Sequence, residues 1–174
     1  KFKIKLFDAF AGYGGAHFAI KKANIKHKAI GFSENDKFAI EIYELNHPGV
    51  KNYGDITKIN PEELPDFNFF TGGFPCQPFS QAGDGLGTND TRGTLFYDVI
   101  RICEYKQPEN ILLENVKGLI TSKHKNTLNT IRKELERIGD LSKVISKDVP
   151  AALVDLGNGE HHIVTRHDLI AAIA

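Results

Sequence analysis

The alternation of short apolar runs with longer amphipathic stretches is the feature that most limits how this chain can fold. The apolar runs are five or six residues long and rich in β-branched and aromatic side chains, which predicts buried strands. Strands that alternate with helices predict an α/β domain with a doubly wound sheet. We expect strands at 2–7, 28–32, 67–71 and 110–114, and helices at 14–23, 36–45, 94–105 and 127–138.

Length, composition and charge restrict the class of protein. The 174 residues fit one domain, and 41% hydrophobic with 25% charged residues is an ordinary globular composition. No apolar run approaches the roughly 18 residues of a membrane span, and no signal-peptide pattern is seen. The two cysteines predict reduced thiols and a cytoplasmic location. The net charge of zero lacks the basic excess of a dedicated DNA-binding domain, so any DNA contact requires a local patch or a further segment.

A glycine-rich turn follows the first predicted strand. Glycines at 12, 14 and 15 allow a tight turn and a close approach to a ligand, and the next helix offers free amides at its N-terminus. Glu34 ends the second strand nineteen positions after Gly15, where a carboxylate can accept both ribose hydroxyls of an adenosine group. The alternative is a solvated acid before a helix that Ser33 or Asn35 caps.

Asp55 follows a third segment and can accept a hydrogen bond from an adenine amino group, although an ordinary turn aspartate fits the sequence equally well.

Cys76 stands between Pro75 and Pro78 at the exit of a strand, in a long polar loop from 74 to 92. The prolines fix the backbone around its sulfur, and a polar strand exit is typical of nucleophilic thiols. No second cysteine or histidine lies at ligand spacing, so we expect no metal.

The second cysteine and one further acid also have expected roles. Cys103 lies inside an apolar periodic run and is expected in the core. Glu114 ends the strand that follows Cys76, and adjacent strands would open both residues onto one cleft. A thiolate and a carboxylic acid beside an adenosine-type cofactor indicate nucleophilic addition assisted by protonation. The alternative for Glu114 is an acid near a helix N-terminus.

The motifs FDAFAGYGG, SEND, GDI, GGFPCQPFS, RGTLFYD and ENVKG resemble, in order, those of cytosine carbon-5 DNA methyltransferases over residues 1–138. The resemblance implies a Rossmann-like fold and S-adenosylmethionine as cofactor. It implies that the partner is double-stranded DNA, which would be bound by Gln77, Ser80, Asn115 and Val116. It also implies that the enzyme is part of a restriction-modification system. The implied cofactor-binding residues are Phe10, Ala11, Gly12, Gly14, Gly15, Glu34, Asn35, Asp55, Ile56, Pro75 and Leu95.

The resemblance also implies a covalent mechanism. Cys76 would add to carbon 6 of a flipped-out cytosine, and Glu114 would hold the ring nitrogen and share a proton with it. Carbon 5 would then take the methyl group before its proton is lost and Cys76 is released. The loop from 80 to 91 would close over the DNA.

The sequence departs from the family at several points. Asn35 stands where the family often has an aromatic side chain over the adenine. The Gln-x-Arg-x-Arg pattern, the target-recognition region and the last motif are not found, so a partner chain or a missing segment is expected to supply target recognition. The alternative function is therefore an inactive, truncated or chimeric cofactor-binding scaffold.

The tail from 140 to 174 differs in character, and we expect two parts, 1–139 and 140–174. The tail predicts three strands and a short final helix. It resembles the closing half of a cystathionine-β-synthase-type (CBS) domain, and the alternative is a replaced end of the sheet. If a CBS-like tail pairs with the tail of a second copy of the chain, the pair would form an adenosine-nucleotide-sensing module. His161, His162 and His167 are expected to be solvated or structural.

Overall fold

A computed structural model of the chain describes residues 4–75, 94–115, 125–139, 152–155, 161–164 and 171–173. The strands of the main sheet are β1 (Ile4–Ala9), β2 (His27–Ser33), β3 (Phe69–Gly72), β4 (Asn110–Asn115) and β7 (Ala171–Ile173). The helices are α1 (Gly15–Lys22), α2 (Lys37–Asn46), α3 (Thr94–Lys106) and α4 (Lys125–Ile138), with short 3₁₀ turns η1 (Ile56–Lys58) and η2 (Pro61–Glu63). β5 (Ala152–Asp155) and β6 (His161–Val164) form a separate antiparallel pair.

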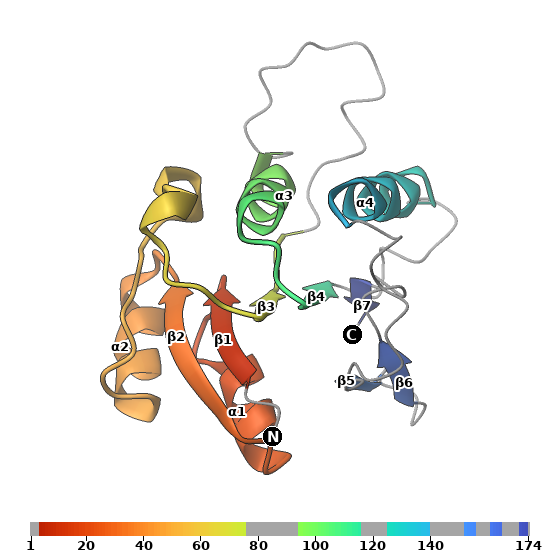
Figure 1. The fold of residues 1–174 in the computed structure, drawn as a ribbon. Coiled ribbons are helices and arrows are strands. Elements are labelled where there is room, and N and C mark those ends of the chain that lie inside the picture. Colours follow the sequence, from red (N-terminus) through yellow and green to blue (C-terminus); the bar gives the residue numbers. More distant parts are fainter. Residues whose placement is uncertain are drawn as a thin grey trace.

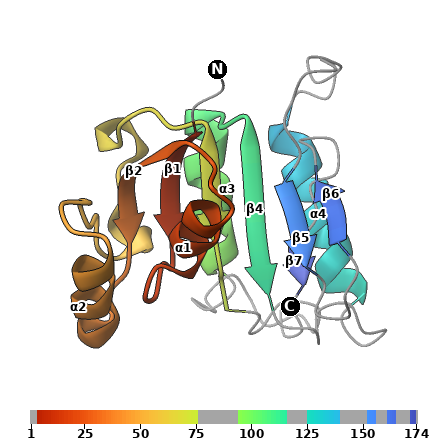
Figure 2. The ribbon, with the colours of Figure 1, turned by 90° about the horizontal axis from the view of Figure 1, so that it is seen from below.

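The main sheet is parallel and has the strand order β2-β1-β3-β4-β7. α1 lies on one face of the sheet, and α3 and α4 lie on the other (Figures 1 and 2). The predicted doubly wound α/β fold is therefore confirmed. The strand before the glycine turn ends two residues later than predicted, because Asp8 and Ala9 still pair with Thr71 and Gly72 of β3.

The larger core fills the space between the sheet and the helices α3 and α4. Phe7, Phe70 and Leu113 reach it from three strands, and Phe96 and Leu135 reach it from the two helices. A second, smaller core forms where Leu6 and Phe69 pack with Ile20 of α1. The sheet is thus buried on both faces, which explains why its strands are continuous apolar runs in the sequence.

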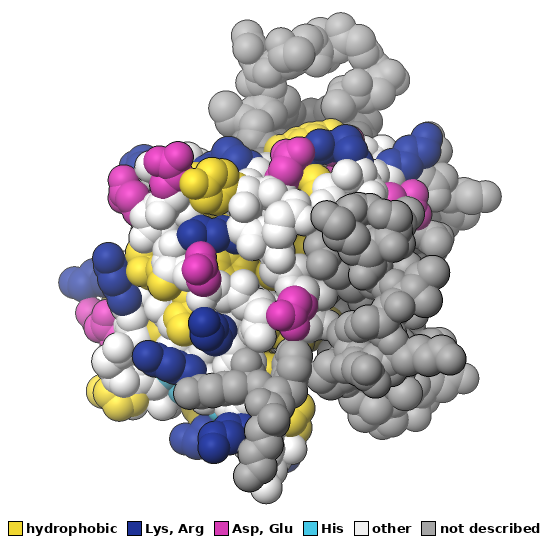
Figure 3. Space-filling model, in the orientation of Figure 1, with side chains coloured by type: hydrophobic (Ala, Val, Ile, Leu, Met, Phe, Trp, Pro, Cys, Tyr) yellow, Lys and Arg dark blue, Asp and Glu magenta, His cyan; other side chains and the backbone are white. Residues whose placement is uncertain are grey.

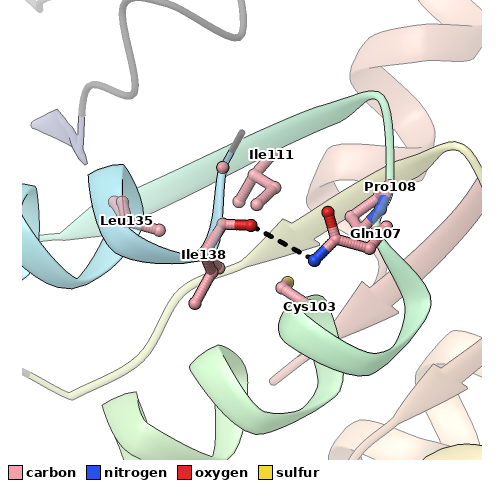
Figure 4. A pocket seen from close by; sticks show the side chains of 7 residues that line it. Cys103, Gln107, Pro108, Ile111, Leu135 and Ile138 are labelled. Carbon is pink, nitrogen blue, oxygen red and sulfur yellow. Dashed lines mark hydrogen bonds between the residues drawn. The ribbon is translucent and has the colours of Figure 1, made fainter. Parts of the chain in front are cut away.

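Cys103 lies in this core and is 1% exposed, as the sequence predicts. Burial raises the pKa of its thiol, which keeps the thiol protonated and unreactive. The gap beside it, bounded by Gln107, Pro108 and Ile138, holds only about 10 Å³ (Figure 4). Gln107 closes one side by donating from Nε2 to the Ile138 carbonyl at 3.2 Å. A gap of this size has room for one water at most, so it is no ligand site.

The tail adds to the sheet. β7 pairs with β4, placing Ala171 to Ile173 opposite Leu113 to Asn115. The short final helix expected here is wrong for these three residues, because an extended segment can satisfy the free backbone groups along the edge of β4. Two of the three expected tail strands correspond to β5 and β6, while the first falls outside the described residues. The division into two parts near residue 139 stays a prediction.

Candidate functional site

The carboxyl ends of β1, β2, β3 and β4 lie along one edge of the sheet, because all four strands are parallel. The glycine turn leaves β1, the Glu34 segment leaves β2, and Gly73 to Pro75 leave β3. Ligands of doubly wound sheets bind outside this edge. Among the residues that the structure describes, most of those predicted to act therefore lie at the edge where a ligand is expected.

The glycine turn needs backbone conformations that few side chains tolerate. Gly12 has φ +55° and Gly14 has φ +90°, and Phe10 adopts φ +52° without being a glycine. A Cβ at Gly12 would meet nothing within 4 Å, so this side of the turn is open. The turn is closed by a hydrogen bond from the Gly14 amide to the Ala11 carbonyl at 2.8 Å. A strained non-glycine residue at such a turn is typical of a functional site.

Glu34 ties the turn to the end of β2. Its Oε2 accepts from the Gly12 amide at 2.9 Å, and its Oε1 accepts from the amides of Asn35 at 2.8 Å and Asp36 at 2.9 Å. A carboxylate offers about four lone-pair positions, so one remains for a ligand hydroxyl. The cap of α2 is Asp36, which accepts from the Ala39 amide at 2.8 Å, so the suggestion that Ser33 or Asn35 caps this helix is wrong.

Asp55 has a structural partner as well as a place at the site. Its Oδ1 accepts from the Thr57 amide at 3.0 Å and from the Thr57 hydroxyl at 2.8 Å, which caps η1. These hydrogen bonds lower the pKa of Asp55, and Lys58 adds to the effect, so the carboxyl is ionised at neutral pH. The turn role and a ligand role are compatible, because both hydrogen bonds use Oδ1, whereas Oδ2 lies 3.9 Å from the Lys58 ammonium.

A cavity of about 220 Å³ lies at this edge. It brings together seven of the eleven predicted cofactor residues and adds Ser33 and Gly54, which sequence reasoning missed. Ser33 is joined to Gly54 by a hydrogen bond from its hydroxyl to the Gly54 carbonyl at 2.7 Å. Ala11, Gly12, Gly14 and Gly15 do not line the cavity. The lining residues are Phe10, Ser33, Glu34, Asn35, Gly54, Asp55, Ile56, Pro75 and Leu95.

Glu114 stands beside the segment that leads to the predicted nucleophile. β3 and β4 are neighbours, as expected, and a Cβ built at Gly73 would lie 3.2 Å from Oε2 of Glu114. The carboxylate is exposed and lies within β4, whereas α4 begins only at Lys125. Cys76, Gln77, Ser80, Val116 and the loop from 80 to 91 fall outside the described residues, as does the side chain of Asn115, so their roles stay predictions.

Asp8 is a buried acid that sequence reasoning missed. It is 3% exposed, and the Thr71 hydroxyl donates to its Oδ1 at 2.7 Å. Its Oδ2 is buried and has no hydrogen-bond partner in the described part of the chain. Burial raises the pKa of Asp8 to about 7, with Glu34 adding to the rise and Thr71 opposing it. The available signal was an acid inside an apolar strand, next to the glycine turn.

The visible face in Figure 3 carries positive and negative side chains interspersed, without a broad area of one sign. This agrees with a chain whose formal net charge is zero. In the part of the chain that the structure describes, no helix has the length and apolar character needed to cross a membrane.

Comparison with known proteins extends these observations. The solved structure of a Dnmt2 methyltransferase from S. pombe matches with a TM-score of 0.61 and 26% identity, over 78% of this chain and 41% of that one. The type II methyltransferase M1.ScrFI of Lactococcus lactis subsp. cremoris is 48% identical over 78% of this chain and 34% of its own length. The type II methyltransferase M.HaeII of Haemophilus aegyptius is 45% identical over 79% of this chain and 42% of its own length.

The chain thus spans about a third to two fifths of the length of these curated relatives. The family described as C-5 cytosine-specific DNA methylase, whose methyl donor is S-adenosylmethionine, matches residues 4–144. This match covers most of the chain and includes the glycine turn, the cavity and Glu114. The chain belongs to the C-5 cytosine-specific DNA methylases.

Proposed function

We propose that this chain is the cofactor-binding and catalytic part of an enzyme that transfers a methyl group from S-adenosylmethionine to carbon 5 of cytosine in DNA. The observation that carries the proposal is the cavity at the carboxyl edge, which places Glu34 and Asp55 beside the apolar side chains of Phe10, Ile56 and Leu95. Carboxylates that accept hydrogen bonds, together with apolar walls, match a nucleoside with a flat base.

The residues present fit one end of the cofactor. The cavity of about 220 Å³ is smaller than the roughly 300–1,000 Å³ of complete small-molecule sites, which fits a nucleoside portion. The remaining lone pair of Glu34 would accept from a ribose hydroxyl, and Asp55 would accept from the adenine amino group. Asn35 would lie along the base. When bound, the cofactor supplies an electrophilic methyl group.

Cys76 and Glu114 would act on the cytosine. The Cys76 thiolate would bond to carbon 6 of a flipped-out base, which places electron density on carbon 5. Glu114 would hydrogen-bond the ring nitrogen and supply a proton to it. Carbon 5 would then take the methyl group, and S-adenosylhomocysteine would leave. A solvent base would remove the carbon-5 proton, so that the double bond between carbons 5 and 6 forms again and Cys76 leaves as a thiolate. The ring nitrogen would return its own proton to Glu114. The position of the Glu114 carboxylate beside Gly73, three residues before Cys76, supports this pairing.

The substrate and biological setting are proposed from the relatives. Both bacterial relatives are named type II methyltransferases, which supports double-stranded DNA as the partner and a restriction-modification system as the setting. A second candidate function is a cofactor-binding scaffold without activity of its own. The observation that favours it is the fraction of each relative that this chain spans, 34% and 42%.

A covalent trap distinguishes the two functions. The chain is incubated with methyl-labelled S-adenosylmethionine and a pool of random-sequence duplexes that contain 5-fluorocytosine. Fluorine at carbon 5 blocks the final elimination, so an active enzyme stays bonded to labelled DNA. We expect a labelled adduct with the wild-type chain, none with Cys76→Ser, and a rate lower by about 100-fold with Glu114→Gln.

Cys103→Ser is the matched control, because Cys103 is the other cysteine of the chain and lies in the core. It should form the adduct as the wild type does. Binding of S-adenosylhomocysteine without an adduct on any duplex would contradict the enzymatic function and support the scaffold. No binding of S-adenosylhomocysteine would contradict both.

A further inference from the structure

Three histidines from separate elements meet beside the glycine turn. They are His17 of α1, His27 of β2 and His47, which directly follows α2. The rings of His17 and His47 stack with centroids 3.8 Å apart and planes at 21°, and His27 meets His17 edge-on at 4.9 Å. Among the residues described, no group of three or more His, Cys, Asp or Glu side chains is arranged to hold a metal ion. The stack therefore calls for another explanation.

His47 lies directly against the turn. A Cβ built at Gly14 would lie 2.5 Å from both Cδ2 and Nε2 of His47, so the imidazole ring faces the α-carbon of Gly14. His47 is 5% exposed, and its Nε2 has no hydrogen-bond partner within the described residues. Because the ring is packed against Gly14, the backbone of the turn cannot move toward α2.

The His47 ring is itself held by neighbours. Tyr43 meets it at 4.9 Å and stacks on Phe32 of β2 at 3.8 Å. The Tyr43 hydroxyl lies 3.4 Å from Nδ1 of His17. The rings of Phe32, Tyr43, His47 and His17 thus form a column from the sheet to the turn, which we call the ring column.

Burial and nearby positive groups favour neutral imidazoles in the ring column. The titratable groups around the two imidazoles are Lys21 of α1, His27 of β2 and Tyr43 of α2, and Asp8 of β1 acts on Tyr43. Burial lowers the pKa of His17 to about 4, and His47, His27 and Lys21 add to this shift. Burial also lowers the pKa of His47, while the Gly14 backbone acts in the opposite direction. A proton on either stacked ring would place a charge beside a second ring and a lysine.

We propose that His47, backed by His17, is a positioning residue that holds Gly14 and the glycine turn in the conformation that binds the cofactor. The inference rests on the proposed function, because it takes the turn as part of the cofactor site. The contact with Gly14 is made by the Cδ2–Nε2 edge of the His47 ring, and a phenyl ring offers an edge of similar shape, so the shape of the ring carries the role.

The first experiment measures the dissociation constant for S-adenosylhomocysteine at pH 7.5 in the whole chain. His47→Ala should raise the dissociation constant at least about tenfold, because a glycine turn that is out of place binds the cofactor less tightly. His47→Phe should bring the dissociation constant back to within about twofold of the wild-type value. His27→Ala is the matched control, because it removes a ring of the same cluster that does not contact Gly14, and it should leave binding unchanged. Equal loss in His47→Ala and His47→Phe would overturn the proposal.

The second experiment needs no cofactor and so separates this proposal from the proposed function. The Gly14 amide resonance is followed by NMR from pH 7.5 to pH 3.5 in the wild type and in a chain carrying both His17→Phe and His47→Phe. In the wild type the resonance should show a step near pH 4 that follows the His17 ring, and this step should be absent from the double variant. Any change that Asp8 causes near pH 7 should be the same in both proteins. An amide that responds equally in both proteins would overturn the proposal, even if His47→Ala does not fold. Failure of the wild type to bind S-adenosylhomocysteine would instead contradict the proposed function.

Discussion

Glu34 has two roles at once, since it fixes the glycine turn and faces the cavity. Replacing it by alanine removes the acceptor for three amides and the proposed acceptor for the ribose. We expect Glu34→Ala to weaken S-adenosylhomocysteine binding at least about tenfold and to lower the free energy of unfolding by about 2 kcal/mol. Calorimetric titration and urea unfolding measure the two effects. Glu41→Ala, an exposed acid of α2 outside the cavity, should change neither.

Asp8 predicts a dependence of stability on pH. Its folded pKa of about 7 lies above the unfolded value of 3.8, so the folded state keeps its proton while the unfolded state loses one as the pH rises from about 4 to 7. The wild type therefore loses stability through this residue across that window. Asp8→Asn removes the loss, which for a shift of this size is on the order of 4 kcal/mol at most.

Urea unfolding of both proteins from pH 4 to pH 7.5 tests this. The advantage of Asp8→Asn over the wild type should grow with pH. The low pKa of His17 has the opposite sign, because its stabilising contribution is lost as the pH falls from 6.5 toward 4. That contribution is present in both proteins and cancels in the difference. A difference that stays constant with pH would contradict the raised pKa of Asp8.

At the residue scale, the sequence predicted local motifs but missed contacts between residues that are far apart in the chain. The glycine turn and Glu34 are recognisable because each stands at a strand end, with the spacing that is typical of a nucleotide site. Asp55 is recognisable only as an acid that follows a glycine, and the structure places it at the start of η1. The histidine cluster could not be predicted, because positions 17, 27 and 47 share no periodicity and meet only when α1, β2 and α2 pack together. Ser33 and Gly54 were missed for the same reason: a hydrogen bond across 21 positions joins them.

The turn between β1 and α1 predicts a contrast between two glycines. Gly14 and Gly49 both have positive φ, +90° and +82°, but a Cβ at Gly49 would meet nothing within 4 Å, whereas one at Gly14 would collide with His47. Gly49→Ala should cost about 1 kcal/mol of stability for its conformation alone. Gly14→Ala should cost clearly more, as measured by urea unfolding. The excess should shrink in a His47→Ala background, and equal costs for the two glycines would contradict the contact.

At the scale of elements, the sequence predicted strands and helices well but their ends less well. Apolar periodicity reports burial, and burial persists through β1 to Ala9 even though Asp8 interrupts the apolar pattern. The expected final helix was wrong over β7, because the three residues pair with a strand more than fifty positions earlier. Local propensity carries no information about such a partner.

At the scale of the whole molecule, the edge strand β7 predicts the effect of removing the tail. A chain that ends after Gly139 keeps every residue that lines the cavity but loses the strand that pairs with β4. An unpaired strand edge favours association between chains. We expect this truncated chain to bind S-adenosylhomocysteine within about threefold of the whole chain, yet to self-associate in size-exclusion chromatography. A monomer as stable as the whole chain would show that the tail adds nothing to the sheet.

The hydrogen bond from Thr71 to Asp8 joins the strand before the glycine turn to the strand that leads toward Cys76. Replacing either residue alone leaves a buried polar atom without its partner, whereas replacing both by apolar residues of similar shape is nearly neutral. A substitution at one of the two positions should therefore be tolerated mainly when the other position changes as well. Across the lineages of such enzymes, we expect residues 8 and 71 to change together, a correlation that spans 63 positions and records the shape of this sheet.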